Sequence, residues 1–233
     1  LNELELALEG VGGTDIDFTV EDTAGAVASE LSATGDELDE ANDVNVVGGT
    51  IDVAAADAVQ DITAYDAVDS DYDISDNAAS LLSSTGVDTV VDSGVDTVNV
   101  TDPSVDAATG AELNELELAL EGVGGTDIDF TVEDTAGAVA SELSATGDEL
   151  DEANDVNVVG GTIDVAAADA VQDITAYDAV DSDYDISDNA ASLLSSTGVD
   201  TVVDSGVDTV NVTDPSVDAA TGAGLNELEL ALR

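Results

Sequence analysis

The chain is 233 residues long and carries 55 acidic side chains against one basic side chain, a formal net charge of −54, although 43% of its residues are hydrophobic. Because almost no cationic side chain can neutralise phosphates, we expect cations as partners rather than nucleic acid or an anionic membrane surface. The sequence has no Cys and no His, which excludes thiolate and imidazole metal sites and the common nucleophile–base pairs, so we expect no enzymatic activity.

A long internal repeat organises the sequence. Residues 1–111 recur letter for letter as residues 113–223, a period of 112 residues. Self-similarity of this length is typical of repeat architectures. We therefore expect one continuous array made of a first repeat at 1–112, a second repeat at 113–224 and the start of a third at 225–233.

Two kinds of segment alternate along the first repeat. Short stretches of β-branched or aromatic residues predict strands at residues 18–21, 44–47, 72–75 and 98–101. Stretches rich in Ala, Leu and Val predict helices at residues 24–31, 54–62, 78–82 and 107–120. An Asp stands ahead of each predicted helix as a candidate N-cap, at Asp22, Asp52, Asp76 and Asp106. Gly48-Gly49 and Thr85-Gly86 are expected to form turns between segments.

Four strand–helix passes in one repeat give about 28 residues per pass. A single pass cannot bury its apolar face, whereas stacked passes can. The predicted fold is therefore an α/β strand–helix solenoid, a right-handed coil with a parallel sheet on one wall and helices on the other. A β-solenoid or another β-rich repeat is the alternative. Open sheet edges at the ends of such an array predict self-association end to end with further repeats or protomers.

Asp residues spaced two apart stand before or within several predicted strands. On an extended backbone their side chains share a face, and clusters of carboxylates suit hard cations such as Ca²⁺. The predicted metal ligands are Asp15, Asp17, Asp69, Asp71, Asp73, Asp127, Asp129, Asp181, Asp183 and Asp185. The alternative is a solvated acidic edge with diffuse counterions.

Two segments carry a resemblance to a known group of proteins. Phe18–Ala28 (FTVEDTAGAVA) and Tyr72–Leu82 (YDISDNAASLL) resemble the strand–Asp–Ala–Ala motif of repeat arrays in giant secreted bacterial proteins, often RTX-type, calcium-associated surface or adhesin molecules. With the intervening passes, the resemblance covers most of the chain. It implies a secreted or cell-surface location and a structural or adhesive role. The glycine-rich calcium nonapeptide of RTX proteins is not matched, since Gly86 and Gly94 are eight residues apart and lack paired glycines.

Near-identical repeats favour a structural role, because exact copies add length to a spacer. We expect a segment of a filament, sheath, stalk or surface layer of a long extracellular protein, and the alternative is an RTX-type calcium-binding adhesin or matrix protein.

The net charge predicts that folding requires screening salt or divalent ions, which would also suit a halophilic origin. No apolar run approaches the ~20 residues of a membrane-spanning helix, so we expect no membrane insertion.

Overall fold

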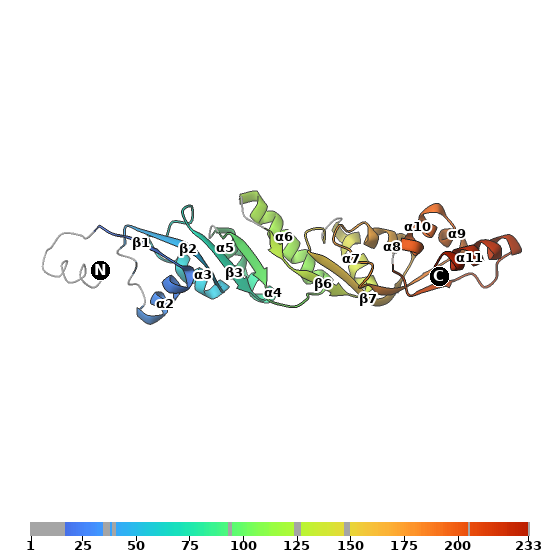
Figure 1. The fold of residues 1–233 in the computed structure, drawn as a ribbon, viewed down its shortest axis with the longest axis horizontal. Coiled ribbons are helices and arrows are strands. Elements are labelled where there is room, and N and C mark those ends of the chain that lie inside the picture. Colours follow the sequence, from blue (N-terminus) through green and yellow to red (C-terminus); the bar gives the residue numbers. More distant parts are fainter. Residues whose placement is uncertain are drawn as a thin grey trace. The chain divides into compact units, whose positions relative to one another are not determined.

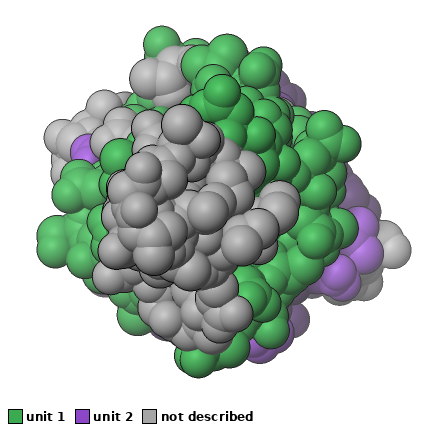
Figure 2. Space-filling view, turned by 90° about the vertical axis from the view of Figure 1, so that its left-hand side faces the viewer, with its two compact units in different colours: residues 1–102, 116–129 green, residues 103–115, 130–233 purple. Residues whose placement is uncertain are grey.

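The computed structural model describes residues 17–34, 38, 41–92, 95–123, 127–146, 150–204 and 206–232. Helices alternate with strands along the chain (Figure 1). The chain divides into two compact units, coloured separately in Figure 2. Unit 1 comprises residues 1–102 and 116–129, and unit 2 comprises residues 103–115 and 130–233. Each unit therefore contains residues from both sequence repeats.

Unit 1 contains one parallel sheet whose strands follow each other in chain order. Its strands are β1 (Thr19–Asp22), β2 (Asp43–Ile51), β3 (Asp71–Asp76), β4 (Thr97–Val100) and β5 (Ile128–Asp129). The helices between them are α2 (Ala24–Thr34), α3 (Val53–Gln60), α4 (Ala78–Leu81) and α5 (Ser84–Asp92). Helix α6 (Ala107–Val123) contributes residues to both units.

Unit 2 has the same arrangement, with four parallel strands in chain order. The strands are β6 (Thr131–Asp134), β7 (Asp155–Ile163), β8 (Asp183–Asp188) and β9 (Thr209–Val212). The helices are α7 (Ala136–Thr146), α8 (Val165–Gln172), α9 (Ala190–Leu193), α10 (Ser196–Asp204) and α11 (Ala219–Ala231). The α/β class and the parallel pairing of the predicted strands are thus confirmed.

The core of each unit follows from the two-residue period of its strands. In β2, Val44 and Val46 are buried, whereas the alternating residues point to the other face. Register then aligns apolar rows across the sheet, as where Ile74 lies between Ile51 and Val98. On the covered side α2 packs against α3, and α3 packs against α5. One face of the sheet is therefore apolar and covered by helices, and the other is polar.

The predicted turn at Gly48-Gly49 is wrong. Both glycines lie inside β2 with φ values of +71° and +94°, and the pairing with β3 shifts register between Val47 and Thr50. Such a bulge needs backbone conformations that residues with a Cβ rarely adopt. The glycines therefore allow the strand to bend and continue to Ile51 instead of ending it.

The predicted turn at Thr85-Gly86 is also wrong, because both residues lie in α5. A Cβ on Gly86 would lie 2.1 Å from the carbonyl oxygen of Ser80 and 2.5 Å from that of Leu81. This glycine thus allows α5 to approach the end of α4 closely. The helix places Thr89 and Val90 in the core, so packing outweighs the modest helix propensity of its β-branched residues.

Candidate functional site

The predicted metal ligands lie at strand starts and on strand faces, and Asp15 lies outside the described residues. Four of them precede a strand and are exposed, namely Asp17, Asp69, Asp127 and Asp181. The others lie within strands β3, β5 and β8, namely Asp71, Asp73, Asp129, Asp183 and Asp185. Of the first group, Asp17 accepts a hydrogen bond at Oδ1 from Asn42 Nδ2 at 3.3 Å.

Strand β3 shows how the sheet arranges these carboxylates. Asp71 and Asp73 share its outer face, because the alternating Tyr72 and Ile74 are buried. In the neighbouring strands, Asp73 lies beside Thr50 and Thr97. The Thr50 hydroxyl donates to Asp73 Oδ2 at 3.4 Å. Register thus places hydroxyl groups beside this carboxylate, which reduces the repulsion between neighbouring charges.

The wider search for a metal centre covers only the part of the chain that the structure describes. There, no three Asp or Glu side chains form a group that could hold a metal ion. Calcium binding at the Asp pairs therefore stays a prediction.

A different set of carboxylates makes specific contacts between consecutive passes. Asp76, at the end of β3, accepts a hydrogen bond at Oδ1 from the N–H of Asn77 at 2.8 Å. Its Oδ2 accepts from the N–H of Val53, the first residue of the preceding helix α3, at 3.3 Å. The first amides of a helix have no partner within the helix, so this side chain caps a helix of the pass before its own.

The same contact recurs along both units. In each case Oδ2 of an Asp accepts from the N–H of the first residue of the preceding pass's helix. We call these five residues the bridging aspartates. The pairs are Asp76–Val53 (3.3 Å), Asp102–Ala78 (2.8 Å), Asp134–Ala107 (3.1 Å), Asp188–Val165 (3.3 Å) and Asp214–Ala190 (2.7 Å). Each bond joins a carboxylate to the positive end of a helix, a favourable electrostatic contact.

The predicted N-caps are confirmed in two cases of four. Asp52 Oδ1 accepts from the N–H of Ala55 at 2.8 Å, and Asp106 Oδ1 from that of Thr109 at 2.8 Å. For α4 the prediction of Asp76 is wrong, because the N-cap is Asn77. Asp22 stands two residues before α2, and its Oδ1 accepts from the N–H of Thr23.

Sequence reasoning did not find the bridging role of these aspartates. The available signal was an Asp at the end of a predicted strand, one residue too early for an N-cap. In a parallel sheet the carboxyl end of each strand lies at the same edge as the starts of the helices that follow the neighbouring strands. That geometry could have predicted a contact with the adjacent pass.

Two N-cap carboxyl groups, those of Asp106 and Asp218, have lowered pKa values. The Thr109 hydroxyl and N–H both hydrogen-bond to Asp106, which holds the pKa of that carboxyl below its usual range. At the start of α11, the N–H of Thr221 likewise lowers the pKa of Asp218. Burial raises the pKa of the Tyr65 and Tyr177 hydroxyls. These shifts follow from local hydrogen bonds and burial.

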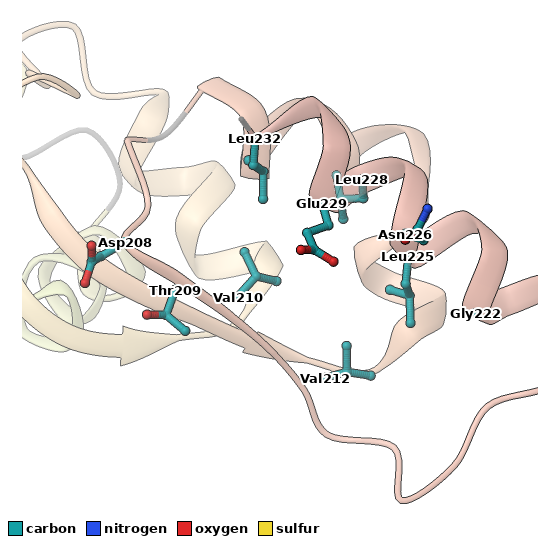
Figure 3. Close-up of a pocket in the computed structure, with 10 residues that line it drawn as sticks. All are labelled: Asp208, Thr209, Val210, Val212, Gly222, Leu225, Asn226, Leu228, Glu229 and Leu232. Carbon is teal, nitrogen blue, oxygen red and sulfur yellow. The ribbon is translucent and has the colours of Figure 1, made fainter.

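An open groove lies between β9 and α11 of unit 2 and has a volume of about 480 Å³. Figure 3 shows Leu225 of α11 and Leu232, which follows that helix, projecting toward the strand, and Val212 of β9 projecting back toward the helix. Asp208 and Glu229 add negative charge to the lining. The groove therefore combines apolar side chains, acidic side chains and strand β9, which is the last strand of its sheet among the residues that the structure describes.

Comparison with known proteins gives no assignment. No protein-family model matches the chain, and no curated protein matches it. Among the helices that the structure describes, none has both the length and the apolar character needed to cross a membrane.

Proposed function

We propose that the chain is a structural segment of a long extracellular or cell-surface protein, built as a strand–helix solenoid and stabilised by cations around its acidic exterior. The observation that carries the proposal is the repeated bridging contact, in which an Asp of one pass caps the helix of the pass before it. Nearest-neighbour contacts of this kind allow passes to be added without limit.

Two further observations support an array rather than two independent domains. The strands follow each other in chain order in both sheets, so each pass pairs with the next. The compact units do not coincide with the 112-residue repeats, because residues 103–115 belong to unit 2 and residues 116–129 to unit 1. In unit 1, β5 of the second repeat pairs with β4 of the first repeat, as expected for a continuous coil.

The proposal can be tested by adding copies of the 112-residue repeat to the chain. Strands lie ~4.8 Å apart across a sheet, so four passes should lengthen a straight solenoid by roughly 19 Å per added repeat. Small-angle X-ray scattering in concentrated NaCl would measure the maximum dimension of chains with two, four and six repeats. A constant increment per repeat is expected, whereas growth with the cube root of mass would refute the proposal.

The second candidate is an RTX-type calcium-binding adhesin or matrix protein, and the shared outer face of Asp71 and Asp73 favours it. Thermal unfolding at fixed ionic strength, with Ca²⁺ or with a chelator, separates the two candidates. If NaCl alone restores full stability, the ions act by screening. If the chelator lowers the melting temperature at constant ionic strength, calcium sites stabilise the array.

A further inference from the structure

One stretch of sequence occurs twice in unit 2, with different surroundings. Residues 103–115 and 215–227 are identical except at Glu112 and Gly224. In the first copy Val105 is 8% exposed, whereas its counterpart Val217 is 41% exposed. Asn114 is buried as well, and its counterpart Asn226 is exposed. The first copy is therefore covered by something that the second copy lacks.

The cover of the first copy is the beginning of the second repeat. Val105 forms a parallel bridge with Val132 of β6. The N–H of Val105 donates to the carbonyl oxygen of Thr131, and the N–H of Glu133 donates to that of Val105, both at 2.9 Å. The first turn of the following helix is bridged too, because Ala107 N–H donates to Asp134.

A side-chain hydrogen bond and one glycine complete this interface within unit 2. Asn114 Oδ1 accepts from the N–H of Glu152 at 3.0 Å. A Cβ on Gly110 would lie 2.6 Å from Cγ2 of Val132 and 3.2 Å from Cδ2 of Leu150. A side chain at residue 110 would therefore force Val132 to shift.

At the groove, the counterpart of this glycine is unobstructed. A Cβ on Gly222 would have one neighbour within 4 Å, Cγ2 of Val217 at 3.8 Å. The edge of β9 is likewise part of the groove lining, whereas the edge of its counterpart β4 pairs with β5. Gly222 and Asn226, which line the groove, are thus the counterparts of Gly110 and Asn114, which are covered in the first copy.

We propose that the groove between β9 and α11, together with the adjoining Val217, binds strand β1 of a second copy of this chain. Phe18–Asp22 has the same sequence as Phe130–Asp134, which pairs with Val105 and lies against Gly110 in the first copy. Resting on the proposed function, this inference adds a defined surface and occupant: a head-to-tail contact between protomers.

The pairs expected between two copies follow from the contacts that Val105 and Ala107 make with residues 131–134. Val217 should form a parallel bridge with Val20 of the second copy, and Ala219 N–H should donate to Asp22 of the second copy. Phe18 and Val20 are only half-buried in this chain, whereas Phe130 and Val132 are buried. Docking would therefore bury apolar surface on both partners. Because both partners are strongly acidic, salt must screen their repulsion for the contact to form.

The test is Gly222→Leu, examined by sedimentation velocity over a range of protein concentrations in concentrated NaCl. The parent chain should form dimers and longer species as concentration rises. Gly222→Leu should remain monomeric, because its side chain occupies the position that Val20 needs. Its melting temperature should be unchanged or higher, since leucine favours a helix more than glycine does. The control is Gly137→Leu, an exposed helical site with no atom within 4 Å, and it should associate like the parent.

A second variant removes the complementary surface. Glu21→Pro deletes the N–H that would donate to Val217, and proline is tolerated on an edge strand. Neither variant should associate alone, but an equimolar mixture should form a 1:1 dimer and nothing longer. Each variant retains one intact surface, so this mixture also shows that both are folded. A mixture that stays monomeric would overturn the inference.

Two other outcomes would overturn it as well. One is a parent chain that is monomeric at every concentration, and the other is association of Gly222→Leu equal to that of the parent. Either result leaves the proposed function intact, because scattering from chains with added repeats does not depend on contacts between separate protomers.

Discussion

The bridging aspartates make a prediction about stability that can be tested at Asp134. Its Oδ1 accepts from the N–H of Thr135 at 2.6 Å, and its Oδ2 from the N–H of Ala107 at 3.1 Å. The variant Asp134→Asn keeps one acceptor oxygen and places an amide NH₂ against the second donor. One hydrogen bond to a charged acceptor is lost, which costs about 1.5–3 kcal/mol.

The change also removes one negative charge from a chain whose net charge is −54, and this relief of repulsion acts in the opposite direction. For exposed charges such effects are about 0–1 kcal/mol. The expected net loss in the free energy of unfolding is thus about 0.5–3 kcal/mol. In a chain of this length that corresponds to a fall in melting temperature of roughly 1–12 °C.

The assay is thermal unfolding followed by far-ultraviolet circular dichroism in concentrated NaCl. The matched control is Asp173→Asn, an exposed Asp that follows α8 in the same unit and removes the same charge. The control should be as stable as the parent or slightly more stable. If Asp134→Asn and Asp173→Asn unfold at the same temperature, the contact between passes contributes no stability and the reasoning is refuted.

Two further predictions concern a cap and a close approach. Asp106→Ala should lower the free energy of unfolding at pH 7 by about 1 kcal/mol. Because the native pKa of Asp106 is depressed, this difference between variant and parent should persist above the unfolded-state pKa of about 3.9 and shrink as pH falls through the native pKa. Urea titrations that give the same difference at pH 7 and at pH 3 would contradict this prediction. Gly86→Ala should destabilise the chain by about 1–3 kcal/mol, since the added Cβ meets the backbone of α4. Its control, Gly25→Ala, has no atom within 4 Å of the added Cβ and should stabilise the chain by about 0.5–1 kcal/mol. Equal melting temperatures for the two variants would show that the close approach of α5 to α4 does not restrict residue 86.

The strands were the most predictable part of the fold. The alternation in Tyr72–Ser75 predicted β3 to within one residue at each end, because burial of every second side chain leaves a direct trace in sequence. Helix α5 was missed, since its Thr, Val and Gly residues are poor helix formers and are held by packing against α4. The bulge at Gly48-Gly49 was missed because paired glycines also suit a turn.

The candidate site was less predictable than the fold. The spacing of Asp71 and Asp73 correctly predicts a shared outer face, since that depends only on the two-residue period of a strand. Which residues lie across from Asp73 depends on the register between neighbouring strands, and the sequence of a single strand does not determine that register. The bridging role of Asp76 depends on the same relation between passes.

The strictly sequential order of the strands has a consequence for how such genes change in length. Each bridging bond joins residues only 23 to 27 positions apart, so every pass is completed by its immediate neighbours. Topologies rich in contacts between residues close in sequence fold quickly, and in repeat arrays folding can begin at any repeat and spread to its neighbours. In the proposed solenoid, unequal recombination between identical copies would insert or delete whole periods and keep each new junction chemically matched.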